Sequence, residues 1–181
     1  MKLEIKSDQN DQKDQKDNET TGYKPSKKVV DLLINYVLVD LADKKFYLDI
    51  ANFYEDKGYP SMKKFCSNLA NKKCFTILDI KKHLESFDIK ISEDIDKTDE
   101  KYESELDAFE TIYKLEEDKL SMLNDVMQAM SEEKDFIHMS CVQTLIMQQL
   151  NVHSCLIKCL KIAKREGSWD NKSRDILEIC F

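Results

Sequence analysis

The sequence predicts an all-α protein, a bundle of four long helices followed by a short fifth helix. Only three Gly and two Pro residues occur among 181 residues, which leaves few places for the tight turns that a β-sheet needs. Apolar residues recur at alternating spacings of three and four over long stretches, which is the period of an amphipathic helix. Hydrophobic residues make up 41% of the chain and charged residues 35%, a balance that suits helices with one buried face.

The first 25 residues differ in composition from the rest of the chain. The run DQNDQKDQKDN contains only Asp, Gln, Asn and Lys. Such a segment buries too little apolar surface to offset the entropy lost on ordering, so we predict a disordered tail over residues 1–25. Pro25 and Ser26 mark a boundary and a helix N-cap, and a single bundle domain is predicted over 26–181.

The first two predicted helices form a pair with a tight turn. The first covers residues 27–56 and ends before Lys57 and Gly58. The second covers 60–87, and Pro60 suits its first turn because proline needs no hydrogen-bonded N–H there.

The second pair of helices follows a long connection. Residues 88–101 are polar with spaced isoleucines, which predicts an extended segment on the surface of the bundle. The third helix is predicted over 102–131 and the fourth over 135–166, stopped by Gly167. A last short helix is predicted over 172–180.

Every long helix has a polar residue in its apolar stripe, near its own middle. Asp40 interrupts the first stripe, Lys73 and Thr76 the second, Glu116 the third and Gln149 the fourth. A buried charge is costly unless it is paired, so polar interruptions in all four stripes predict a shared polar layer at the bundle centre. The alternative is that some of these side chains reach the surface and that the stripes form an ordinary core.

The residues of this layer favour an ion pair over a metal site. Asp40 and Glu116 supply two negative charges and Lys73 removes one, which leaves poor ligation for two hard cations. No Glu-x-x-His pair, the motif of di-iron bundles, occurs in the sequence. We therefore predict a pair between Lys73 and Glu116, with four side chains completing its hydrogen bonds: Asp40, Tyr47, Thr76 and Gln149.

Composition also predicts the surroundings of the protein. A net charge of −7 argues against a nucleic-acid partner. No apolar run approaches the roughly 20 residues that cross a bilayer, and the N-terminus MKLEIKSDQN has no signal core. The six cysteines form no CxxC pair, so we expect free thiols in a reducing compartment, the cytoplasm.

Three stretches of the sequence carry a family resemblance: YESELDAFETIYKLEEDKLSMLNDVMQAM, YLDIANFYEDKGYPSMKKF and GSWDNKSRDILEICF. Through them the chain resembles a ferritin subunit over about residues 29–178. The first stretch is similar to the third helix of that family, the second to the end of its first helix and the following turn, and the third to its last loop and short fifth helix. The resemblance implies a ferritin-like four-helix bundle with a long crossover between the second and third helices.

The resemblance also assigns the positions of the family's ferroxidase centre. It places retained or shortened metal ligands at Asp40, Glu116 and Gln149, and a retained tyrosine at Tyr47. A glutamate and a histidine of the family are replaced by Lys73 and Thr76. A lysine at this site resembles the catalytically silent light-chain type of subunit, so the resemblance implies vacant metal positions and no enzyme activity.

By this resemblance the chain is a structural subunit of a hollow iron-storage shell, formed with itself or with other ferritin subunits. Iron is then the implied cargo, and neither nucleic acid nor membrane is an expected partner. Two departures weaken iron handling by shells of this chain alone. The second helix carries more lysines than acids, and the pore positions near Ser140 and Gln143 are uncharged. The alternative is a four-helix bundle derived from a ferritin that serves protein interaction without iron.

Overall fold

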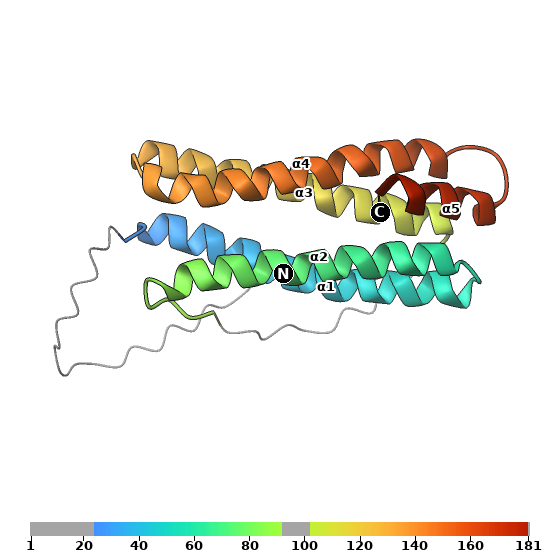
Figure 1. Cartoon of the computed structure of the whole chain (residues 1–181), viewed down its shortest axis with the longest axis horizontal. Coiled ribbons are helices and arrows are strands. Elements are labelled where there is room, and N and C mark those ends of the chain that lie inside the picture. The colour runs from blue at the N-terminus through green and yellow to red at the C-terminus, as the bar shows by residue number, and fades with distance from the viewer. Residues whose placement is uncertain (1–23, 92–101, 181) are drawn as a thin grey trace.

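The computed structural model describes residues 24–91 and 102–180, and these residues form five helices and no strand (Figure 1). The predicted all-α class, with four long helices and a short fifth, is confirmed. The helices are α1 (Lys27–Asp56), α2 (Pro60–Glu85), α3 (Glu105–Glu132), α4 (Phe136–Ala163) and α5 (Trp169–Cys180).

The four long helices form two antiparallel hairpins that lie against each other (Figure 1). The α1–α2 hairpin turns at Gly58, whose φ of +81° lies in the left-handed region that glycine adopts without strain. The α3–α4 hairpin turns at Lys134, where φ is +56°. These two tight turns hold each hairpin together and leave its apolar faces available for the other.

The chain crosses the length of the bundle between the two hairpins. The end of α2 and the start of α3 lie at opposite ends of the bundle, so α2 and α3 run parallel (Figure 1). Ile89 and Ile91 pack partly buried against the core, beyond the end of α2. The rest of the predicted extended segment, residues 92–101, and almost all of the predicted tail lie outside the described residues.

Several helix ends differ from the predicted ones because of local capping. α3 begins at Glu105, three residues later than predicted, since the Ser104 hydroxyl accepts a hydrogen bond from the Asp107 N–H at 3.1 Å and acts as its N-cap. α2 ends at Glu85, two residues early, and Asp88 then adopts a left-handed φ of +63°.

α5 begins at Trp169, three residues before its predicted start, and packs against α2 and α4. The Trp169 ring lies 6.2 Å from that of Tyr54 and 6.4 Å from that of Tyr59, measured between ring centroids. The Lys172 ammonium lies 5.2 Å above the Trp169 ring and donates a hydrogen bond to the Ala163 carbonyl at 3.2 Å. These contacts attach α5 to the end of the bundle near the α1–α2 turn.

The apolar core is divided into two halves along the bundle axis. One half lies toward the α1–α2 turn and includes Tyr54, Phe65, Phe109 and Leu156. The other lies toward the α3–α4 turn and includes Leu33, Ile80, Leu123 and Val142. The side chains buried between these halves are polar, and they form the candidate site.

The structure bears on two predictions about the surroundings of the protein, namely the state of its cysteines and whether a helix could cross a membrane. The prediction of free thiols is wrong at Cys155, which is disulfide-bonded, whereas Cys66, Cys74 and Cys141 are free thiols. The compartment inferred from six thiols therefore stays a prediction. None of the described helices is both long enough and apolar enough to cross a membrane.

Candidate functional site at the bundle centre

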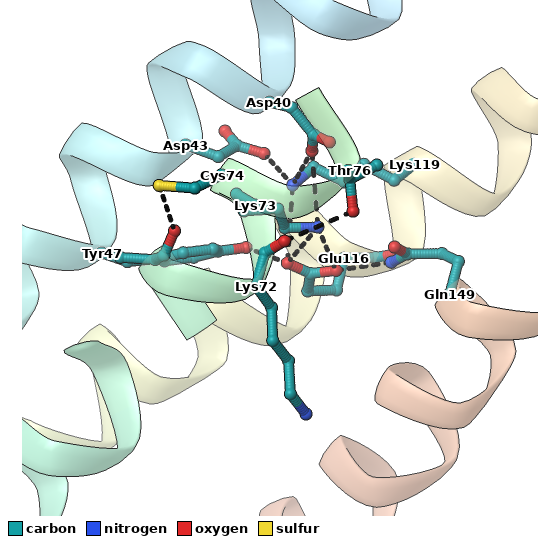
Figure 2. Close-up of polar contacts among 11 residues, drawn as sticks. Asp40, Asp43, Tyr47, Lys72, Lys73, Cys74, Thr76, Glu116, Lys119 and Gln149 are labelled. Atoms are coloured by element: carbon teal, nitrogen blue, oxygen red, sulfur yellow. Dashed lines mark hydrogen bonds and ion pairs between the residues drawn. The ribbon is translucent and has the colours of Figure 1, made fainter. Parts of the chain in front are cut away.

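Seven polar side chains from all four long helices meet between the two halves of the core (Figure 2). We call them the central cluster: Asp40, Asp43 and Tyr47 from α1, Lys73 from α2, Glu116 and Lys119 from α3, and Gln149 from α4. All seven are at most 5% exposed. The cluster therefore has to satisfy its charges internally.

Lys73 and Glu116 form one ion pair of the cluster. The Lys73 Nζ lies 3.0 Å from both carboxylate oxygens of Glu116. It also lies 3.4 Å from Asp40 Oδ1. The ammonium of α2 thus connects carboxylates of α1 and α3.

Lys119 supplies a second buried ammonium, which the sequence-based interpretation did not identify. Its Nζ lies 2.5 Å from Asp43 Oδ2, 2.8 Å from Asp40 Oδ1 and 3.5 Å from Glu116 Oε1. Lys119 is 1% exposed, a rare degree of burial for lysine. Each ammonium of the cluster therefore contacts Asp40 and Glu116.

A different phase of the α3 stripe would have revealed Lys119. The predicted stripe passed from Tyr113 through Glu116 to Leu120, and both of these apolar residues are only partly buried. The buried positions instead follow Ile112, Glu116, Lys119 and Leu123. Asp43 follows Asp40 by one helical turn and is buried on the same face, but the predicted stripe passed from Asp40 to Tyr47 without including it.

Glu116 is the main hydrogen-bond acceptor of the cluster. The Tyr47 hydroxyl donates to Glu116 Oε1. The Gln149 side-chain amide donates to Glu116 Oε2 at 2.5 Å and to the Glu116 backbone carbonyl at 2.9 Å. Helices α1 and α4 thereby orient a carboxylate that α3 presents.

Thr76 does not complete the cluster, which corrects the sequence-based prediction. Its hydroxyl donates to the Lys72 carbonyl in the preceding turn of α2, at 3.4 Å (Figure 2). The buried positions of this part of α2 are Lys73 and Ile77. Thr76 lies to one side of them, on the side of α2 that faces α4.

The cluster shifts the pKa values of its members in opposite directions. Burial alone would raise the pKa of Glu116, but Lys119, Lys73 and the two hydrogen-bond donors lower it to about 2. Burial would lower the pKa of Lys119, but Tyr47 and the three carboxylates raise it well above its usual value. Glu116 is therefore ionised and Lys119 protonated around neutral pH.

Two other members are shifted toward their neutral forms. Burial, assisted by the charge of Lys119, lowers the pKa of Lys73, although Glu116 and Asp40 oppose this. Burial raises the pKa of Asp43 despite the attraction of Lys119. Asp40 Oδ2 has no hydrogen-bond partner within the described part of the chain. Burial therefore works against the ionised forms of Lys73 and Asp43, and so against the ion pairs that they form.

The carboxylates of the central cluster are arranged to pair with the two lysine ammonium groups and not to bind two metal ions. Three carboxylates face two ammonium groups, which leaves one negative charge if all five are ionised. The oxygens of Glu116 and Asp40 Oδ1 are already engaged by ammonium or hydrogen-bond donors. Among the described residues, no group of three or more His, Cys, Asp or Glu side chains could hold a metal ion. Two multivalent cations would therefore have to displace both lysines.

Comparison with known proteins shows similarity in fold. No protein-family model matches the sequence, and no curated protein matches it in sequence. Among solved structures, a humanized archaeal ferritin aligns with a TM-score of 0.77 and 19% identity, over 87% of this chain and 96% of that chain. The open-pore ferritin of Archaeoglobus fulgidus aligns with a TM-score of 0.78 and 14% identity, over 87% and 98%.

A variant of PmFTN whose crystals were soaked in iron also aligns, with a TM-score of 0.72 and 18% identity, over 82% of this chain and 99% of that chain. At these identities the likeness concerns the fold. It confirms the ferritin-like bundle that the sequence resemblance implied.

Proposed function

The chain has the ferritin fold, and on that premise we propose that it is a structural subunit of an iron-storage shell that lacks a complete ferroxidase centre. Its cargo would be iron, and its partners would be further copies of itself or an active ferritin subunit. In this proposal the central cluster holds the bundle together and does no redox chemistry.

The contacts of Lys73 and Lys119 are the observation that carries the proposal. Both ammonium groups lie within 3.5 Å of Asp40 or Glu116, the two acids that the family resemblance assigns to metal ligation. Lys119 has a raised pKa, so its proton is not released to make room for a metal near neutral pH. An internal cation thus takes the electrostatic role that a bound metal would have in an active subunit, which makes this centre similar to the silent light-chain type.

Co-assembly with an active subunit follows from the same reasoning. A shell made only of this chain would need another source of iron oxidation. The exposed part of α2 also offers several lysines, including Lys64 and Lys82, where a mineral-nucleating face would carry acids. We therefore expect this chain to contribute stability and shape to a mixed shell.

The lysines of α2 also favour the second candidate function, an iron-independent interaction protein with the same bundle. The size of the purified particle distinguishes the shell subunit from the interaction protein. Light scattering of the affinity-tagged full chain, purified through its tag alone and after co-expression with an untagged active ferritin subunit, should give a large spherical particle that contains this chain in at least the mixed sample. A monomer or dimer in both samples would reject the shell and favour the interaction protein.

A further inference from the structure

One side of α4 carries a second stripe of residues, which the four-helix bundle does not bury. Its members recur at alternating spacings of four and three residues, and all are exposed: Phe136, Ser140, Gln143, Met147, Leu150, Ser154, Ile157 and Lys161. The buried stripe of the same helix, which includes Val142, Gln149 and Leu156, faces the core. We call the exposed stripe the α4 seam.

The α4 seam is apolar and uncharged over most of its length. Phe136 is 68% exposed, Met147 59% and Leu150 44%. With Ile157 they make up four of the nine large apolar side chains that stay exposed in the described part of the chain. The 28 residues of α4 contain no Asp or Glu, and the only charge in the seam is that of Lys161. Apolar surface gathered on one helix face is typical of an interaction site.

The spacing of the seam specifies the kind of partner. Alternating steps of four and three give a repeat of 3.5 residues, which is the pattern along which two helices pack as a coiled coil. The seam keeps this repeat over about three and a half heptads, long enough for a coiled-coil contact. A fitting partner is a helix with an exposed apolar stripe of the same period, and α4 of a second copy is such a helix.

The order of large and small residues along the seam matches itself when two copies run antiparallel. A two-fold axis between Met147 and Leu150 places Met147 of each copy opposite Leu150 of the other. In the same register Ser140 lies opposite Ile157 of the other copy. A small residue then faces a large one, which lets the two surfaces interdigitate.

The polar members of the seam also meet suitable partners in this register. Gln143 lies opposite Ser154 of the second copy, where an amide and a hydroxyl can share a hydrogen bond. Phe136 lies opposite Lys161 of the second copy, where the ammonium can contact the aromatic ring. A parallel pair would instead bring the two Lys161 side chains together, so the seam favours the antiparallel pair.

The charges at the two ends of α4 favour the same orientation. Residues 132–135 contain three acids and one lysine, whereas residues 158–166 contain four basic residues and one acid. An antiparallel pair brings the acidic end of one copy to the basic end of the other. Glu132 and Lys164 already form surface ion pairs within the chain, so these charges orient the contact more than they strengthen it.

We propose that the α4 seam binds the α4 seam of a second copy of this chain, as an antiparallel pair with its two-fold axis between Met147 and Leu150. The contact is closed, since both copies use the same surface. It goes beyond the proposed function and rests neither on the central cluster nor on iron.

Sedimentation equilibrium of the full chain measures the contact. Leu150→Lys should weaken self-association at least about tenfold, because a two-fold interface buries the introduced charge twice. Leu48→Lys is the matched control, since Leu48 on α1 is 43% exposed and lies outside the seam. It should change the association constant by no more than about twofold. A wild-type chain that is monomeric at every concentration, or equal losses in the two variants, would overturn the proposal.

Two double variants test the orientation of the pair. Gln143→Glu with Ser154→Lys places opposite charges across the antiparallel interface but like charges across a parallel one, and it should associate at least as tightly as the wild type. Gln143→Lys with Ser154→Lys places lysines opposite each other in both orientations and should associate at least about tenfold more weakly. Equal weakening by both double variants would contradict the antiparallel register.

A benzophenone amino acid at Gln143 locates the contact in an assembly of any size. Light-induced cross-links between isotopically labelled and unlabelled copies should map close to Ser154 of the second copy. Cross-links that map only to other parts of the second copy, or none between copies, would refute the proposed pairing whether or not the chain builds a shell.

Discussion

The side-chain nitrogen of Lys119 lies 2.8 Å from Asp40 Oδ1, so a fully buried ammonium of α3 is paired with a fully buried carboxylate of α1. The same nitrogen reaches Asp43 Oδ2 at 2.5 Å. Two helices from different hairpins are therefore joined by charge at the point where the apolar core is interrupted.

Removing this ammonium should destabilise the bundle strongly. Lys119→Met leaves Asp40 and Asp43 without their closest cation, and breaking a buried pair costs roughly 3–5 kcal/mol. Urea unfolding at one fixed protein concentration, followed by circular dichroism, measures the loss. Lys114→Met, an exposed position on the same helix, should change the free energy of unfolding by less than about 0.5 kcal/mol. Similar losses in both variants would show that the buried pair contributes little.

Stability should fall in acid as Glu116 becomes protonated. Its pKa is lowered from 4.5 to about 2 in the fold, so its contribution is present above pH 4.5 and is lost as the pH falls toward 2. The shift corresponds to about 3 kcal/mol. Glu116→Gln should be less stable than the wild type at neutral pH, and its free energy of unfolding should fall less over this interval.

Glu117→Gln provides the control for that pH series, because Glu117 is the exposed neighbour of Glu116. It should keep the acid dependence of the wild type. If the free energy of unfolding of Glu116→Gln falls between pH 4.5 and pH 2 as much as that of the wild type, other carboxylates cause the loss of stability in acid.

The Tyr47 hydroxyl should stabilise the ionised form of Glu116. Tyr47→Phe removes a donor to a buried carboxylate and should cost about 1.5–3 kcal/mol in the free energy of unfolding. The substitution should also raise the pKa of Glu116, so that the loss of stability in acid begins at a higher pH. Tyr113→Phe removes a hydroxyl that contacts Glu117 at the surface, and its effect should be much smaller. A Tyr47→Phe chain as stable as Tyr113→Phe would exclude a structural role for this hydrogen bond.

Removing both internal cations should create affinity for divalent metal. The double variant Lys73→Glu with Lys119→Gln changes the balance of the cluster toward carboxylate, and Co²⁺ should then raise its melting temperature. Lys73→Glu alone should respond weakly, since Lys119 still neutralises Asp40 and Asp43. The control is Lys64→Glu with Lys114→Gln, which makes the same charge change at exposed positions. An equal response to Co²⁺ in the two double variants would contradict the location of the site.

The sequence was informative where a residue clearly broke a pattern. Asp40, Lys73, Glu116 and Gln149 stand out because each interrupts an apolar stripe, and all four are buried at the bundle centre. Lys119 was missed because the adjacent Leu120 offered an apolar residue at an equally plausible position of the stripe. Periodicity gives the face of a helix only to within about one residue, and a buried lysine looks like a surface one.

The length of the connections predicted the topology, since a long segment between the second and third helices allows the crossover. Helix ends were less predictable because they depend on individual contacts. Ser104 caps α3 through a single hydrogen bond, and Trp169 extends α5 by packing on Tyr54 and Tyr59. The space between α2 and α4 was also not predictable, since side chains from four helices line it.

In the proposed function, the ammonium groups of Lys73 and Lys119 take the place of a redox metal pair. The most direct measurement is the rate of oxidation of ferrous iron by oxygen, followed by stopped-flow absorbance with the purified full chain. We predict a rate no faster than in buffer alone. A rapid phase whose amplitude grows in proportion to the protein concentration would contradict it.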